Sequence, residues 1–264
     1  MFTKVIALIA VLITGSLLLY GVADFPAFGD PNSPANAGVA GGAPSISQYF
    51  ITDTYSDTKV PNLVTAVLAD YRGYDTMFET VVIFAAGMAI FAILRVLGNV
   101  NDKHHRCYKV TTISDGDHNR IIVGSTVKVI VPIVQLFALY VVAHGHYSPG
   151  GGFQGGVIFA ASFILLALAD QLNAALRRLS ETRYIILAVV GILIYAGFGV
   201  VCQILGKNFL DYGILEPLLF TKGPEMARSH SMLGVEIGVA FTVTTIMFAI
   251  YANLASRGSL KHSL

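Results

Sequence analysis

Residues 144–156 read HGHYSPGGGFQGG and lie between two long apolar segments, residues 121–143 and 157–169. The stretch combines two histidines with a proline that is followed by three glycines. Irregular backbone at membrane depth is tolerated only where protein or water satisfies its N–H and C=O groups. We therefore interpret the stretch as a tight, polar connection between two membrane helices with a functional role. A plain helical hairpin is the alternative.

The composition indicates the class of protein. Of the 264 residues, 55% are hydrophobic and 12% are charged, and the mean hydropathy is +0.68. Soluble domains typically contain about 25% charged residues, so we predict an all-α integral membrane protein. The net charge of +1 gives no indication of nucleic-acid binding. Cys107 lies in a basic loop and Cys202 in an apolar run, so we expect free thiols and no disulfide.

Six segments are long enough to cross a membrane, because a membrane helix needs roughly 20 mostly apolar residues. The first has an apolar run of about 18 residues, whereas a signal peptide typically has 7–15, so we expect an uncleaved anchor. The six segments are approximately Val5–Val22, Thr76–Leu97, Ile121–Ala143, Gly152–Asp170, Tyr184–Leu205 and Met232–Ala255.

Lys and Arg residues are concentrated in alternate loops, and such loops stay in the cytoplasm. Both termini are therefore predicted to be cytoplasmic, and the 144–156 connection is predicted to be external. An external loop at 23–60 is rich in Pro, Gly, Ala and Ser, and we interpret it as a segment that is flexible or ordered on a partner, and not as a domain. The predicted organisation is a two-helix region at 1–97, a cytoplasmic linker at 98–120, a four-helix domain at 121–257 and a cytoplasmic tail at 258–264.

Ionisable side chains inside the predicted spans are candidates for function, because each costs on the order of 2.5–3.5 kcal/mol to insert. Lys128 lies roughly 10 Å into the third span. Pro132, four residues later, has no N–H to offer the carbonyl of residue 128, which leaves a polar niche. The alternative is a lysine that extends to the inner interface.

Glu236 lies in the last span, five to seven residues from its predicted outer end. Gly234 and Gly238 flank it and form a face of small residues that allows close approach of another helix. A carboxylate beside such a face would be buried in protein. We expect an ion-translocating role, with a structural salt bridge as the alternative.

Asp75 and Glu79 follow Arg72 at the start of the second span and share a helix face at i, i+4 spacing. Two carboxylates so placed could pass a proton or coordinate a cation. They could equally be a helix cap at Asp75 and a first-turn acid. The spacing does not decide between these alternatives.

Histidine is the residue type whose charge ordinarily changes near neutral pH, so His144 and His146 suit a proton-exchanging mouth. A metal site is disfavoured, because this pair without a nearby Cys or acid supplies only two ligands. Together with Lys128 and Glu236 they form a graded set of ionisable groups that resembles a proton relay. Gaps of about 10 Å would need water or other subunits. Gly150, Gly151 and Gly152 allow the backbone to turn, and Gly152, Gly156 and Ala160 give the fourth span a close-packing face. Pro149 and Gly155 belong to the same structural motif.

The 144–156 stretch resembles the HGHxSPGGGFxGG motif of the B subunit of Mrp-type cation/proton antiporters and its counterpart in membrane-bound hydrogenases. The resemblance covers residues 118–257, and Glu236 stands where that family carries an acid before an Ile-Gly-Val run. Residues 61–76, which read PNLVTAVLADYRGYDT, together with Glu79 resemble the small E subunit of membrane-bound hydrogenases and the end of the antiporter A subunit. This second resemblance covers about residues 1–97.

The two resemblances imply a fusion of neighbouring subunits from a complex that exchanges Na⁺ or another monovalent cation for H⁺. They imply a non-catalytic, multi-pass subunit of the cell inner or plasma membrane that has other subunits and lipid as partners. They also tie Asp75 and Glu79 to ion translocation. We see no cofactor site in the sequence. The alternatives are the same module in a hydrogenase or other redox-driven pump, a dissolved-carbon uptake system, and a scaffold without a direct role in transport.

Overall fold

A computed structural model describes residues 2–37, 45–101, 118–170 and 172–256. Every regular element in these ranges is helical, and six helices are long and apolar enough to cross a membrane. The chain is therefore an all-α, multi-pass membrane protein, as the sequence predicted. Cys107, the tail at 258–264 and most of the predicted linker at 98–120 lie outside the described residues.

The chain divides into two units, residues 1–53 and residues 54–264. The first contains α1 (Phe2–Val22), a series of turns and the beginning of α2 (Ile46–Thr58), which ends in the second unit. The segment 23–60, which the sequence indicated to be a loop, therefore contains the helix α2. Ser45 Oγ accepts a hydrogen bond from the Gln48 N–H at 3.2 Å, which satisfies one free donor at the start of this helix.

The six predicted spans are all present, but the last is longer than predicted. Helix α10 begins at Pro224, eight residues before the predicted start at Met232. Proline is favourable in the first turn of a helix, and the polar residues that follow it lowered the hydropathy of the segment. Glu236 consequently lies about 18 Å from the start of its helix, which corrects the predicted position. The spans are α1, α4 (Gly73–Asn101), α5 (His118–Ala143), α6 (Gly152–Asp170), α8 (Glu181–Ile204) and α10 (Pro224–Ala255).

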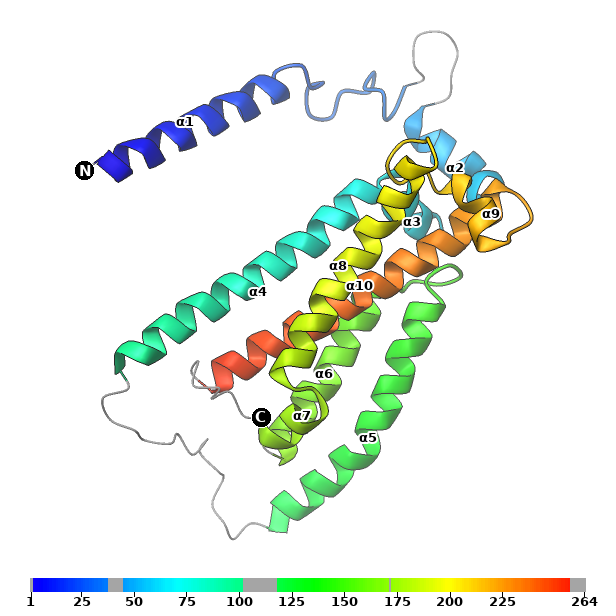
Figure 1. Ribbon diagram of the computed structural model, residues 1–264. Helices are drawn as coiled ribbons and strands as arrows, with labels where there is room; N and C mark the ends of the chain where they lie inside the picture. Colours follow the sequence, from blue (N-terminus) through cyan, green and yellow to red (C-terminus); the bar gives the residue numbers. More distant parts are fainter. Residues whose placement is uncertain (1, 38–44, 102–117, 171, 257–264) are drawn as a thin grey trace. The chain divides into compact units, whose positions relative to one another are not determined.

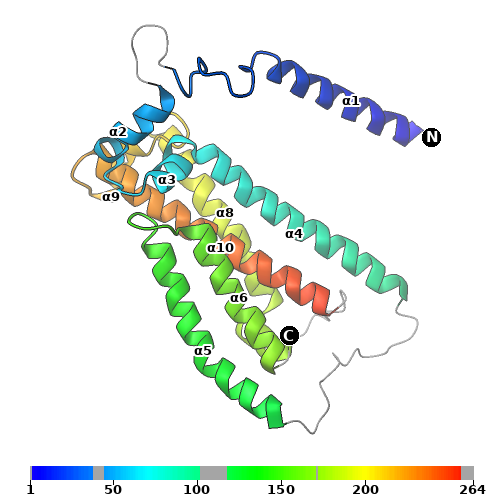
Figure 2. The ribbon, with the colours of Figure 1, turned by 180° about the vertical axis from the view of Figure 1, so that it is seen from behind.

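Short helices connect the spans of the second unit. α3 (Leu63–Ala66) and the π-helix η1 (Val67–Tyr71) precede α4, and α7 (Leu172–Arg178) follows α6. The 3₁₀-helix η2 (Tyr212–Leu215) and α9 (Glu216–Leu219) connect α8 to α10. Within this unit, α10 packs against α8, α6 and α4, and α5 packs against α6 (Figures 1 and 2).

The start of α4 rules out the helix cap, which was one of the alternatives for Asp75. Helix α4 begins at Gly73, so Asp75 lies in its first turn and is not its cap. The backbone N–H of Asp75 donates to the carbonyl of Arg72 at 2.9 Å, and the two side chains form an exposed ion pair. Tyr195 Oη donates to the carbonyl of Gly73 at 2.8 Å and so fixes this helix end to α8.

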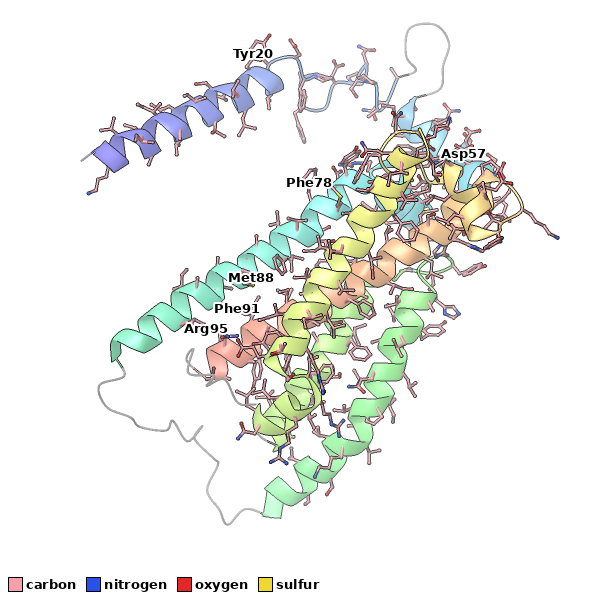
Figure 3. The ribbon with its side chains drawn as sticks, viewed as in Figure 1. Tyr20, Asp57, Phe78, Met88, Phe91 and Arg95 are labelled. Atoms are coloured by element: carbon pink, nitrogen blue, oxygen red, sulfur yellow. The ribbon has the colours of Figure 1, made fainter. Side chains whose placement is uncertain are left out.

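Helix α4 has one packed and one exposed face. Phe91 is buried, and its ring contacts that of Tyr184 edge-on at 6.3 Å between centroids. Phe78 and Met88 are exposed on the same helix (Figure 3). In a membrane, such an exposed apolar face contacts lipid or another subunit.

Helices α8 and α10 approach closely at a pair of glycines. A Cβ atom added at Gly191 would lie 2.3 Å from the carbonyl oxygen of Gly238. A Cβ atom at Gly238 would lie 2.7 Å from the carbonyl oxygen of Gly191. Thr242 Oγ1 donates to the carbonyl of Ala188 at 3.0 Å beside this crossing. Small residues therefore set the distance between the two helices.

We expect Gly191→Ala to destabilise the fold by about 1–3 kcal/mol, because the added methyl group has no space at the crossing. The measurement is the temperature at which the detergent-solubilised complex loses half of its folded chain. Gly197→Ala on the same helix is the matched control, since nothing lies within 4 Å of a Cβ atom there. Equal melting temperatures for the two variants would show that the crossing is not tightly packed.

Candidate functional site

The connection between α5 and α6 is a compact turn, as the glycines indicated. Helix α5 ends at Ala143, and α6 begins at Gly152. The backbone N–H of Gly151 donates to the carbonyl of Val141 at 3.2 Å. Gly151 has a φ of +120°, which side-chain-bearing residues rarely adopt. A Cβ atom at Gly150 would lie 2.8 Å from the carbonyl oxygen of Val141. The turn therefore depends on its glycines.

Glu236 lies directly beneath this turn, on α10. A Cβ atom at Gly145 would lie 2.9 Å from Glu236 Oε2, and one at Gly151 would lie 2.9 Å from Glu236 Oε1. A Cβ atom at Gly152 would lie 2.0 Å from the backbone oxygen of Glu236. The absence of side chains at these three glycines allows the turn backbone to pack against the carboxyl group. The contact also places the carboxyl group near the first residues of α6, where the helix dipole favours negative charge.

The carboxyl group of Glu236 is buried, and one of its oxygens has no hydrogen-bond partner. The residue is 8% exposed, and its Oε2 atom is buried with no hydrogen-bond partner. Within the described ranges, Glu236 takes part in no ion pair. The structural salt bridge considered as an alternative is therefore not formed among these residues. A buried polar atom without a partner in a native structure calls for a functional or solvent explanation.

The two histidines of the turn point to different elements. His146 is buried, and its Nε2 lies 2.9 Å from the carbonyl oxygen of Ser229 on α10, so Nε2 carries the proton. The ring of His144 stacks on that of Tyr140 at 3.9 Å between centroids, and its Nδ1 is buried without a partner. The histidines therefore do not face one another. Among the described residues there is no group of three or more potential metal ligands.

The other predicted acidic and basic residues lie on other helices than Glu236, and their side chains are exposed. Lys128 is exposed on α5, with Pro132 inside the helix as expected from the sequence. Lys128 is sixteen residues from His144, roughly 24 Å along the helix axis. Asp75 and Glu79 are exposed on α4. The predicted set is thus divided between a buried group at the turn and exposed groups on two outer helices.

A buried ion pair near the turn was not predicted. Arg228 Nε donates to Asp70 Oδ2 at 2.6 Å, and the Asp70 side chain is 7% exposed. The Arg228 guanidinium lies 5.3 Å from the centroid of the Tyr71 ring, and Tyr71 Oη donates to Asp57 Oδ2 at 2.7 Å. Burial raises the pKa of Asp70, and the Arg228 guanidinium opposes this shift. The pair ties η1 to the first turns of α10. The polar residues that follow Pro224 were the only indication in the sequence that this region could form such an ion pair.

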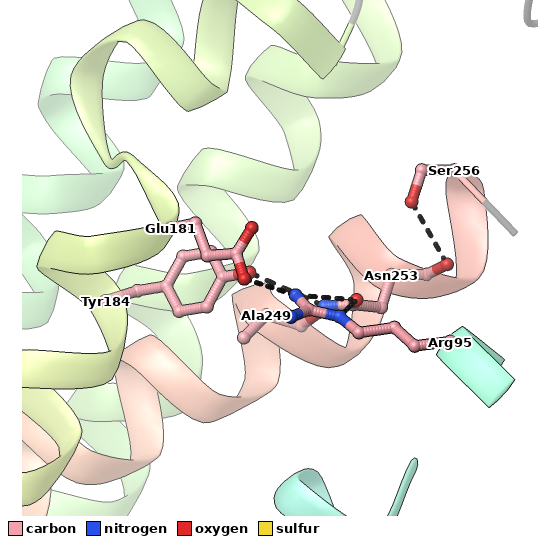
Figure 4. Close-up of polar contacts among 6 residues, drawn as sticks. All are labelled: Arg95, Glu181, Tyr184, Ala249, Asn253 and Ser256. Carbon is pink, nitrogen blue, oxygen red and sulfur yellow. Dashed lines mark hydrogen bonds and ion pairs between the residues drawn. The ribbon is translucent and has the colours of Figure 1, made fainter. Parts of the chain in front are cut away.

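A second polar cluster ties the far end of α10 to α4 and α8 (Figure 4). The Arg95 guanidinium of α4 pairs with Glu181 at the start of α8, and Arg95 Nε donates to Asn253 Oδ1 at 3.4 Å. Asn253 Nδ2 in turn donates to the carbonyl of Ala249 at 2.8 Å and to Tyr184 Oη at 3.5 Å. These contacts hold three spans together at the end opposite the turn.

Comparison with known proteins gives different relatives for the two parts of the chain. Residues 122–249 match the family described as a domain related to the MnhB subunit of Na⁺/H⁺ antiporter. A relative from Staphylococcus epidermidis, named as antiporter subunit mnhB2, is 34% identical over 137 residues, which are 50% of this chain and 94% of the relative. The chain belongs to the MnhB family. The mnhB2 relative from Staphylococcus aureus is 30% identical over 139 residues, which are 52% of this chain and 95% of the relative.

The part of the chain that precedes the MnhB region matches a second family. Residues 40–106 match MbhE, the family described as the E subunit of MBH, and we call these residues the MbhE part. Both resemblances noted in the sequence are thereby confirmed, although this second match begins at residue 40 and does not include α1. Glu236 and the turn lie in the MnhB part, whereas Asp70, Asp75 and Glu79 lie in the MbhE part.

Two solved structures resemble the whole chain. A chain of the membrane-bound sulfane sulfur reductase, an archaeal respiratory membrane complex, is 25% identical with a TM-score of 0.62. That match covers 96% of this chain and 98% of the other. A chain of the Mrp complex from Dietzia sp. DQ12-45-1b is 20% identical with a TM-score of 0.60, covering 99% of this chain and 26% of the other. The similarity to the chain of the Mrp complex shows a shared fold.

Proposed function

We propose that this chain is a non-catalytic subunit of a multi-subunit, Mrp-type antiporter that exchanges Na⁺ or another monovalent cation for H⁺. The MnhB membership and the antiporter names of its relatives support the assignment. The complex lies in the cell inner or plasma membrane, with both termini of this chain in the cytoplasm. The partners are the other subunits, the lipid bilayer and the transported ions.

The buried, unpaired carboxyl group of Glu236 is the observation that carries a role in the ion path. A permanent charge at this position would be costly inside the membrane. A proton or a cation can neutralise the group in turn, and such alternation is what an exchanger requires. The glycine turn above it packs its backbone against the carboxyl group, and the same turn carries two histidines. Glu236 is thus the group at which a proton or cation is taken up and released.

The exposed ionisable groups extend this proposal to the contacts with neighbouring subunits. Lys128 on α5 and the pair Asp75 and Glu79 on α4 lie on helices whose exposed faces meet lipid or protein. Charged groups inside a membrane usually face a protein interior or a water-filled cavity. We place them on the ion path where it passes between this chain and other subunits, with His144 and His146 at its outer mouth.

The direct test is the Na⁺-induced collapse of a pH gradient in inverted membrane vesicles that contain the complete complex. The complex carries either the native chain or the Glu236→Gln variant, and its subunit content is measured in the same vesicles. Loss of exchange from a complete complex supports the role in the ion path. Loss of subunits with Glu236→Gln would favour the scaffold alternative.

A redox-driven complex is the second candidate, and one observation favours it. The match to the sulfane sulfur reductase chain covers 98% of that chain, whereas the match to the Mrp-complex chain covers only 26% of that chain. The fused architecture is therefore shared with a respiratory complex. Purification of the native complex distinguishes the two: co-purifying redox subunits and ion transport that depends on electron transfer would support the second candidate.

A further inference from the structure

The MbhE part of the chain contacts the back of the histidine turn through side-chain donors. Thr65 Oγ1 donates to the carbonyl of Gly145 at 2.7 Å, and Asn62 Nδ2 donates to the same carbonyl at 2.8 Å. Asn62 Nδ2 also lies 2.9 Å from the carbonyl oxygen of Ser148. The backbone N–H of Asn62 donates to the carbonyl of His146 at 2.9 Å. Three carbonyls of the turn are thus held by two residues of the MbhE part.

These donors are themselves fixed in place. Asn62 is the N-cap of α3, and its Oδ1 accepts from the backbone N–H of Val64 at 3.1 Å. Its Nδ2 also lies 3.0 Å from Thr65 Oγ1. Thr65 is 5% exposed. A short helix with both donors at its start therefore presents a rigid surface to the turn.

Gly145 lies between this surface and the Glu236 carboxyl group. Its carbonyl oxygen receives the two side-chain donors, while its α-carbon faces Glu236 Oε2, which a Cβ atom there would approach to 2.9 Å. A shift of Gly145 away from α10 would open space beside Oε2 and admit water. The position of the backbone that covers Glu236 is therefore set from outside the MnhB part.

We propose that Asn62 and Thr65 are positioning residues that hold Gly145 over Glu236 and so couple the MbhE part to the ion-exchanging carboxyl group. This inference rests on the proposed role of Glu236. It assigns to the MbhE part a function separate from its own acidic residues on α4. It also offers a physical reason for the fusion, because one chain then carries both the hydrogen-bond donors Asn62 and Thr65 and the histidine turn that they hold.

The test compares Thr65→Val with Thr80→Val, two substitutions that remove a buried threonine hydroxyl. Thr80 Oγ1 donates to the carbonyl of Thr76 in its own helix, so its loss does not affect the turn. We expect Thr65→Val to lower the exchange rate in inverted vesicles about fivefold at unchanged subunit content, the effect of one lost hydrogen bond. Thr65→Ser retains the donor and should restore the rate. Thr80→Val should stay within about twofold of the native rate.

A double-mutant cycle shows whether Thr65 acts through Glu236. In a Glu236→Asp background the carboxyl group is withdrawn from Gly145, so Thr65→Val should have little further effect, and the two losses should not add. Additive losses, or equal behaviour of Thr65→Val and Thr80→Val, would overturn the positioning role even if Glu236→Gln abolishes exchange. Full exchange with Glu236→Gln would instead remove the proposed function itself.

Discussion

Glu236→Gln should reduce cation/proton exchange at least about a hundredfold, the loss typical when a proton-transferring group is removed. The amide has nearly the same shape as the carboxyl group, so the close contacts with Gly145 and Gly151 can persist. It cannot take up and release a proton, and it carries no charge for a cation. The rate is measured as Na⁺-induced collapse of the pH gradient in inverted vesicles with the complete complex.

Glu225→Gln is the matched control for this variant. Glu225 is an acid on the same helix but lies in the first turn of α10, eleven residues or roughly 16 Å along the helix from Glu236. We expect its amide variant to retain at least about half of the native rate, as is usual for a change away from the reacting group. A Glu236→Gln complex that keeps half of the native rate would contradict the account.

Asp70→Ala should destabilise the complex strongly, by about 3–5 kcal/mol, because it leaves the Arg228 guanidinium without its buried partner. The ion pair joins η1 to α10, and the Asp70 side chain is 7% exposed. The expected result is a large fall in the temperature at which the solubilised complex loses half of its folded chain. Arg228→Ala should have an effect of similar size, and the double variant should be less destabilised than the sum of the two.

The exposed ion pair between Arg72 and Asp75 is the control for the buried pair between Asp70 and Arg228. Its side chains are 62% and 54% exposed, and such pairs contribute about 0–1 kcal/mol. Asp75→Ala should therefore leave the melting temperature almost unchanged, whatever its effect on transport. Equal destabilisation by Asp70→Ala and Asp75→Ala would mean that burial of the first pair is not what stabilises the junction.

The membrane spans could be predicted because each is a long apolar run, and length alone identifies it. The position at which α10 begins could not be predicted. Arg228 and its polar neighbours read as an external loop, because the ion-pair partner of Arg228, Asp70, lies 158 residues earlier in the chain. A cap at the start of α4 was one of two alternatives for Asp75, because its side chain is suitable. The helix instead begins at Gly73, where Tyr195 from another span bonds the backbone.

The residues of the candidate site could be identified from the sequence, but the contact between them could not be predicted. Glu236 and the glycine turn each stood out by residue type. Their contact depends on the packing of α10 against α6, across about 90 residues of chain. Asn62 and Thr65 gave no signal as isolated polar residues. Their role follows only from the carbonyl of Gly145, which lies about 80 residues further along.

The most direct measurement of the central claim is an infrared difference spectrum of the purified complex, recorded with and without Na⁺ at constant pH. The account predicts a carboxyl C=O band that changes on Na⁺ addition in the native complex and is missing from the Glu236→Gln complex. Difference spectra that are identical in the native complex and the variant would contradict it, because Glu236 would then not change its protonation when the cation binds.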